Sequence, residues 1–261
     1  MRKRVPRKTI LPSLLSLPDG STSSDLDKIA EAFNHHFASS MNQSNADITS
    51  TKPTMCSTYL NTIDITPEDI IKALAKTKIS TFPGPDNIPS IVYKKGGPEI
   101  LTLLLHIFKL SIHTATFPSC WKKSIIIPKH KSGSQSMLAN YQPIHHTSVA
   151  SRILERIINT KLIKHLTEHI ITPAQHGFLS KKSRTTCNIA FLDQVTKAID
   201  DQQALIVIYL DMTKAFDRVP HKPLLSKLAE YGIQDPLLSW IKSFLQHRSQ
   251  SVQVNKITSK Q

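Results

Sequence analysis

Asp211 is the residue best placed to do chemistry, because it directly follows seven apolar residues, Ala204 to Leu210 (ALIVIYL). A continuous apolar run of this length predicts a strand covered on both faces, and such a strand would carry the Asp211 carboxylate into a cleft. A carboxylate there could hold Mg²⁺ for chemistry on phosphates, although Asp211 could instead cap the following turn. No GxxxxGK[ST] loop occurs, which excludes a P-loop nucleoside triphosphatase of the usual form.

A weaker candidate site is the sequence His165-Leu166-Thr167-Glu168-His169, which has the HxxEH spacing of an inverted zinc protease. That chemistry also needs a downstream glutamate ligand, and with twelve histidines in the chain such matches arise easily. Cys56, Cys120 and Cys187 lie far apart and include no CxxC pair, so neither a disulfide framework nor a zinc knuckle is predicted. A reducing, intracellular location, cytoplasmic and/or nuclear, is therefore expected.

Positive charge is concentrated in the middle of the chain. The net charge is +14, and residues 87–186 alone hold fourteen Lys and Arg against three acids, a net +11. Such asymmetry predicts binding to phosphates, with nucleic acid the first candidate and an anionic membrane surface the second. No apolar stretch reaches the roughly 18 residues that a transmembrane helix needs, so no transmembrane helix is expected. Nucleic acid, and no membrane, is the predicted partner.

Hydrophobic periodicity and capping signals predict the elements that would position these residues. Helices are expected at 25–39, from Thr66 and Pro67 onward, at 98–115, 148–165, 185–200, 223–231 and 236–247. Residues 122–131 predict a short strand with basic flanks that turns at 132–134, and SVQVNKIT near the end predicts another strand. Residues 82–89, with three prolines and a glycine, predict a loop, and residues 40–58 predict a polar linker.

Several motifs taken in order resemble the N-terminal half of the reverse transcriptase domain of a non-LTR (LINE-type, jockey-like) retrotransposon. The resemblance covers roughly residues 66–261 and is carried by FPGPDNIP, WKKSIIIPKHKSG, NYQPI, SRILERII, QHGFLSKKS, YLDMTKAFDRVPH, LLSKLAEYGI and LLSWIKSFLQHRSQSVQVN. It implies an α/β (α+β), helix-rich fold with the fingers and a partial palm of a right-hand polymerase. The implied organisation is a tail, helix and polar linker at 1–60, a fingers-like region at 61–200 and a palm-like region at 201–261.

The resemblance also implies roles for single residues. Asp211 would be a catalytic, metal-binding aspartate, with the Met212 carbonyl as a further ligand. Ala215 and Phe216 would contact the nucleotide, Phe216 packing under the incoming sugar, although a core aromatic is an alternative for Phe216. Lys129 and Lys131 would neutralise the triphosphate, a solvated hairpin rim being the alternative. RNA template or hybrid backbone would be contacted by Arg152, Arg156, Lys161, Lys164, Lys181, Lys182 and Arg184.

Two departures from the family pattern limit this interpretation. Where the family usually has Tyr-Arg-Pro-Ile, this chain has Tyr141-Gln142-Pro143-Ile144, followed by His145-His146. The loss of that arginine removes a bidentate phosphate donor. The chain also stops at Gln261, before the family's Ala-Asp-Asp-type motif, so we expect a truncated domain with an incomplete site that needs the missing C-terminal palm and thumb.

The implied activity is RNA-directed DNA polymerisation, with an RNA template, a DNA primer, deoxynucleotides and Mg²⁺. The alternative is a nucleic-acid-binding module without catalysis.

Overall fold

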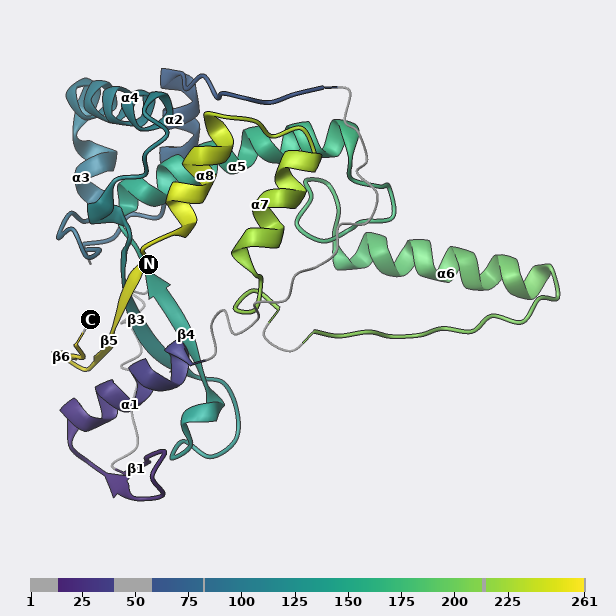
Figure 1. The fold of residues 1–261 in the computed structure, drawn as a ribbon. Coiled ribbons are helices and arrows are strands. Elements are labelled where there is room, and N and C mark those ends of the chain that lie inside the picture. Colours follow the sequence, from purple (N-terminus) through teal and green to yellow (C-terminus); the bar gives the residue numbers. More distant parts are fainter. Residues whose placement is uncertain (1–13, 40–57, 82, 213–214, 261) are drawn as a thin grey trace, which may run out of the picture.

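The computed structural model describes residues 14–39, 58–81, 83–212 and 215–260. The helices are α1 (Leu26–Ala38), α2 (Pro67–Ala75), α3 (Ser90–Lys95), α4 (Gly97–His113), α5 (Val149–His169), α6 (Arg184–Asp200), α7 (His221–Glu230) and α8 (Leu237–Leu245). The strands are β1 (Leu15–Ser16), β2 (Thr22–Ser23), β3 (Lys123–His130), β4 (Tyr141–His146), β5 (Ser249–Val254) and β6 (Ile257–Thr258), and short 3₁₀ turns cover Ser119–Trp121 and Leu138–Asn140. Figure 1 shows a helical body above a small sheet, with α6 projecting to one side.

The helical body is held by one apolar core that α2, α4, α5 and α8 share. Phe117 is 1% exposed and packs edge-on against Trp121, Trp240 and Phe244, which joins the turn after α4 to α8. The indole nitrogen Nε1 of Trp240 donates a hydrogen bond to Ser111 Oγ (2.9 Å), so its polar group is satisfied inside the core.

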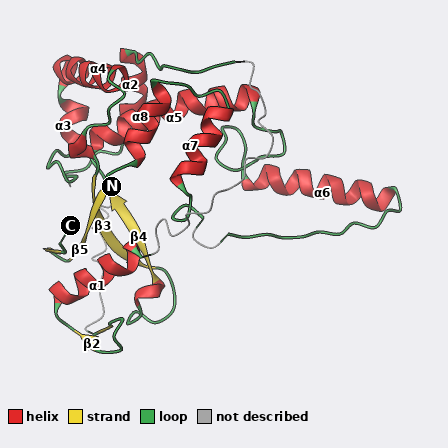
Figure 2. Ribbon diagram, viewed as in Figure 1, coloured by secondary structure: helices red, strands yellow, loops and turns green. Residues whose placement is uncertain are grey.

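The sheet below has the strand order β4-β3-β5-β6, with β3 antiparallel to β4 and parallel to β5 (Figure 2). In the β3–β4 hairpin, Ile126 lies opposite His145, Pro128 opposite Pro143, and Lys129 opposite Gln142. Helix α1 covers one face of the sheet and forms a second core with it.

Local sequence signals predict most elements correctly. Thr66 and Asp69 form the expected reciprocal capping box at the start of α2, and Asp25 accepts from the Asp27 backbone N–H at the start of α1. The basic strand and its turn form the hairpin, and residues 83–89 contain no strand or helix longer than an isolated bridge. The 98–115 sequence is apolar over much of the helix circumference, which predicts burial between other elements, but only one face of α4 is buried and Leu103 and Leu110 are half exposed.

The prediction that Ala204–Leu210 forms a strand covered on both faces is wrong. This segment returns from the far end of α6 as an extended chain without a sheet partner among the described residues (Figure 1). Ile206 is 86% exposed and Leu210 is 91% exposed. A strand buried on both faces needs hydrogen-bonded neighbours and a layer on each side, and the described parts of the chain provide neither for this run. Helix α6 has no buried residue either.

Helices and strands from the three expected regions pack against and pair with one another. Helix α1, from the region expected at 1–60, packs on β5 and β6 from the palm-like region. Strand β5 in turn pairs with β3 from the fingers-like region. The expected basic tail lies outside the described residues, as does nearly all of the polar linker. Within the described residues, no helix is long and apolar enough to cross a lipid bilayer.

The exposure of the 204–210 run gives a direct test. Because Ile208 is 75% exposed, Ile208→Lys should change the free energy of unfolding by no more than about 0.5 kcal/mol. The matched change Ile126→Lys, at a side chain with 0% exposure, should cost at least about 3 kcal/mol because it buries an unpaired charge. Urea unfolding followed by circular dichroism measures both, and equal losses would show that the run is buried.

Candidate nucleic-acid and nucleotide site

Asp211 and Met212 end the extended segment, immediately before residues 213–214, which the structure does not describe. Both are exposed, Met212 by 80%. Across the described ranges, no group of three or more His, Cys, Asp and Glu side chains could hold a metal ion. Asp211 belongs to no such group in the described residues, and a two-metal site needs more than one carboxylate.

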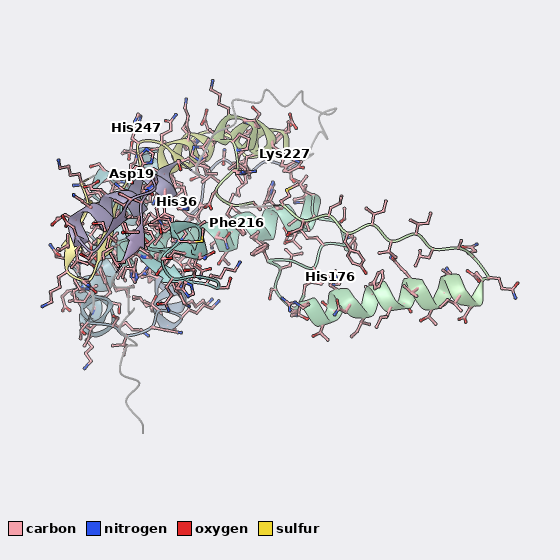
Figure 3. The ribbon with its side chains drawn as sticks, turned by 90° about the horizontal axis from the view of Figure 1, so that it is seen from below. Asp19, His36, His176, Phe216, Lys227 and His247 are labelled. Carbon is pink, nitrogen blue, oxygen red and sulfur yellow. The ribbon has the colours of Figure 1, made fainter. Side chains whose placement is uncertain are left out.

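Ala215 and Phe216 lie in the turn that leads toward α7, and both are exposed. Phe216 is 77% exposed, which contradicts the alternative of a core aromatic. Its ring meets that of Phe178 edge-on, with centroids 5.6 Å apart and planes at 90°. In Figure 3, Phe216 lies where the arm containing α6 joins the rest of the molecule.

A cavity of about 950 Å³ opens beside Phe216, at the end of the sheet where β3 and β5 begin and β4 finishes. Its wall comes from five separate segments, four of which contribute polar or basic side chains. The lining residues are Ala38, Ser124, His145, Thr147, Phe216, Asp217, Val219, His221, Leu224, Leu245, Gln246, His247, Arg248, Ser249 and Gln250.

Two basic side chains of this cavity have altered pKa values. Burial lowers the pKa of His145, the nearby Asp217 carboxylate opposes that shift, and Arg248 adds to it. Burial also lowers the pKa of Arg248, while Glu155 opposes the shift. Arg248 donates from Nη1 to the Phe244 carbonyl oxygen (3.0 Å), and its guanidinium lies 4.8 Å from the centre of the Phe244 ring.

Lys129 and Lys131 lie at the other end of the hairpin. Lys129 is exposed opposite Gln142, and the backbone N–H of Lys131 donates to the Asn140 carbonyl oxygen (2.9 Å). Lys129 is five residues along β3 from Ser124, which lines the cavity, or about 17 Å. The structure therefore does not bring these two lysines together with Phe216.

Among the seven cations expected on nucleic acid, two connect α5 to α2. Arg156 Nη1 donates to the Ala73 carbonyl oxygen (2.7 Å) and to Thr77 Oγ1 (3.1 Å). Lys161 forms a 3.2 Å ion pair with Asp69. Burial would raise the pKa of Asp69, but hydrogen bonds from Thr66 and Lys161 and the charge of Lys161 outweigh it, so that pKa is lowered.

The other five cations lie on α5, in the turn before α6 and at the start of α6. Lys164 lies 3.9 Å from Glu168 on the same helix, and Lys182 Nζ donates to the Pro173 carbonyl oxygen (3.0 Å). Lys181 lies in the preceding turn, and Arg184 is the first residue of α6. Arg152 lies near His146, whose pKa is lowered by burial and by that arginine. Arg156, Lys161, Lys164 and Lys182 thus have partners within the fold.

A second cavity, of about 570 Å³, lies between α5, α7 and α8 and is mainly apolar, with Arg152, Glu155 and Arg156 among its lining residues. On the HxxEH sequence, His165 is buried, with Nε2 2.9 Å from the Tyr231 carbonyl oxygen, and Glu168 is near Lys164. These contacts support helix packing and give no support to a zinc protease.

Sequence reasoning missed Arg248 and the other polar residues of the larger cavity. Arg248 belongs to a motif that resembles the family, but no local pattern reveals that Phe244 and Phe117 hold its side chain. The only signal was the departure from the family pattern at His145-His146.

Comparisons with known proteins agree on one family. The family model of the reverse transcriptase (RNA-dependent DNA polymerase) matches residues 127–261. The probable RNA-directed DNA polymerase from transposon BS of Drosophila melanogaster is 30% identical over 189 residues, which cover 72% of this chain and 21% of that protein. The RNA-directed DNA polymerase from mobile element jockey of the same species is 28% identical over 194 residues, covering 73% of this chain and 21% of that protein.

A further relative is the Pol polyprotein from a type-1 retrotransposable element R2 of Popillia japonica. It is 28% identical over 140 residues, covering 52% of this chain and 19% of that protein. The chain spans about a fifth of the length of the curated relatives it matches.

The contacts of Arg156 predict a structural effect. Arg156→Gln should lower the free energy of unfolding by about 1.5–3 kcal/mol, because it removes charge-assisted hydrogen bonds to the end of α2. Arg184→Gln, at an exposed residue, should change it by less than about 0.5 kcal/mol. Urea unfolding measures both values, and a stability unchanged by Arg156→Gln would contradict the structural role.

Proposed function

Because the chain belongs to the reverse transcriptase (RNA-dependent DNA polymerase) family, we propose that it forms the part of an RNA-directed DNA polymerase that holds the nucleic-acid strands and supplies one metal-binding carboxylate, Asp211. The observation that carries this proposal is the family match over residues 127–261, which includes the segment YLDMTKAFD. The exposed Phe216 beside a cavity with basic residues supports it.

The proposed reaction is nucleotidyl transfer. The primer 3′-hydroxyl attacks the α-phosphate of a deoxynucleoside triphosphate, a new phosphodiester bond forms, and pyrophosphate leaves. Mg²⁺ is the ion that this chemistry uses on phosphates, and the Asp211 carboxylate and the Met212 carbonyl oxygen are the proposed ligands from this chain. Two metal ions about 4 Å apart need further carboxylates, so we propose that the 261-residue chain binds nucleic acid without polymerising.

Phe216 and Ala215 are the proposed contacts to the incoming nucleotide. An exposed aromatic ring in a turn next to Asp211 can pack against the sugar and disfavour a 2′-hydroxyl. The small side chain of Ala215 leaves room beside that ring.

The proposed strand contacts come from the exposed cations. Lys181 and Arg184 are exposed to solvent and can approach phosphates without breaking a contact within the fold, whereas Arg156 and Lys161 already bind α2. Such contacts give an affinity that depends on salt and not on sequence.

Salt dependence of binding tests the strand-holding part of the proposal. A labelled RNA–DNA primer–template should bind with a log K that falls linearly with log salt, and Lys181→Gln/Arg184→Gln should reduce the slope by about 1.5. Fluorescence anisotropy from 50 to 200 mM KCl measures the slope. The control Lys72→Gln/Lys256→Gln removes two exposed charges elsewhere and should leave the slope nearly unchanged. Equal slope changes would contradict the assignment.

Primer extension tests the catalytic part. The 261-residue chain, given Mg²⁺, deoxynucleotides and a primed RNA template, should show no synthesis, and Asp211→Asn should leave strand binding within about twofold. Template-dependent synthesis that Asp211→Asn abolishes would contradict the proposed lack of activity. A chain that shows no affinity for the primer–template at 50 mM salt would contradict the whole proposal.

A further inference from the structure

The larger cavity contains more basic groups than acidic ones. Its lining includes Arg248 and the three histidines His145, His221 and His247, against one carboxylate, Asp217. These residues come from three segments that are far apart in sequence and meet at the end of the sheet. The guanidinium of Arg248 is a permanent cation with several N–H donors, and the histidine rings add further donors, so the arrangement favours an anion.

Arg248 is held in a fixed orientation. Its guanidinium lies over the Phe244 ring at 4.8 Å and near the Phe117 ring at 5.9 Å, and Nη1 donates to the Phe244 carbonyl oxygen. Stacking on a ring uses the face of the guanidinium, so the remaining N–H groups at its edge stay available as donors. No carboxylate of the described residues lies within ion-pair distance of it, and although neighbouring atoms partly desolvate the guanidinium, part of the residue is exposed to solvent.

His145 supplies a second polar group. It lies one residue before the end of β4, pairs in register with Ile126 and lines the cavity wall. Although the His145 side chain reaches solvent, the atoms packed around it desolvate the ring, and this desolvation lowers its pKa; the Asp217 carboxylate opposes the shift and the Arg248 charge adds to it. A phosphate bound between Arg248 and His145 would offset the repulsion between these two basic groups and would accept from the His145 ring N–H.

We propose that this cavity binds a phosphate group carried by a nucleotide, with Arg248 and His145 as its main ligands. The proposal rests on the proposed function and assigns to it residues outside the seven cations and two hairpin lysines named above. The volume of about 950 Å³ suits a nucleotide better than a lone ion, and the exposed Phe216 ring in the wall gives the sugar or base an apolar surface.

The phosphate could come from the backbone of a strand or from a free nucleoside triphosphate. Two probes separate these sources: a labelled oligoribonucleotide without a terminal phosphate, and dTTP alone. The variants are Arg248→Gln, Arg248→Lys and His145→Gln. The matched control is Lys256→Gln, which removes one exposed charge beyond the opposite end of β5.

The expected result is a loss of about tenfold in affinity for one probe with Arg248→Gln, a smaller loss with Arg248→Lys and His145→Gln, and less than about twofold with Lys256→Gln. Circular dichroism and urea unfolding check that each variant folds; if Arg248→Gln does not, the exposed His145→Gln decides. Equal losses from the Arg248 or His145 variant and the control would overturn the proposal, because they would show a general charge effect.

A third probe separates failure of this site from failure of the proposed function. Inorganic pyrophosphate is added to the wild-type chain, and histidine side-chain signals are followed by NMR. Movement of the His145 signal that Arg248→Gln abolishes supports the cavity as a phosphate site even if no oligoribonucleotide binds. If oligoribonucleotide binds equally to wild type and to Arg248→Gln, and pyrophosphate moves no histidine signal, the site is overturned while the proposed function stands.

Discussion

The structure depends on strand β3 being hydrogen-bonded along both of its edges. Its partner β4 follows directly in the hairpin, but its other partner β5 comes more than a hundred residues later and pairs in parallel, with Ile126 opposite Val252. A parallel partner requires a long crossover, and here the crossover contains α5, α6, α7 and α8. The position of this crossover determines where the helical body lies over the sheet and which side chains meet at the cavity.

Sequence reasoning succeeds where the determining interactions are local. The capping box of Thr66 and Asp69, the turn after β3 and the amphipathic pattern of α1 involve residues only a few positions apart. It fails for Ala204–Leu210, because an apolar run predicts that a segment should be covered but cannot show what covers it. The β3–β5 pairing could not be predicted either, since no pattern in β3 specifies a partner so distant in sequence.

At the candidate site, too, local sequence patterns predict part of the arrangement, and contacts between distant residues determine the rest. The count of basic residues predicts affinity for phosphate, but it does not distinguish cations used by the fold from those left for a ligand. Arg156 and Lys161 are similar in sequence context to Arg152, yet they bind α2. No local sequence pattern marks Arg248 as a functional residue. The ring of Phe244, one helical turn before it, and the ring of Phe117, distant in sequence, hold its side chain in the cavity that His145 also lines. Tertiary neighbours therefore decide which charges remain for function.

The facing prolines of the hairpin affect how the sheet meets other molecules. The backbone N–H of Lys131 donates to the Asn140 carbonyl oxygen, and hydrogen-bonded and non-hydrogen-bonded residue pairs alternate along an antiparallel ladder. Pro128 and Pro143 therefore face each other as a non-hydrogen-bonded pair, so their missing N–H groups cost the hairpin no hydrogen bond. An ordinary residue at either position would point its N–H group away from the partner strand of the hairpin. For Pro143 this direction is the outer edge of β4, and for Pro128 it is the β5 side of β3, beyond the end of the β3–β5 pairing at Ile126. Both edges thus lack a donor that an incoming strand would need, which protects the hairpin from strand-by-strand self-association.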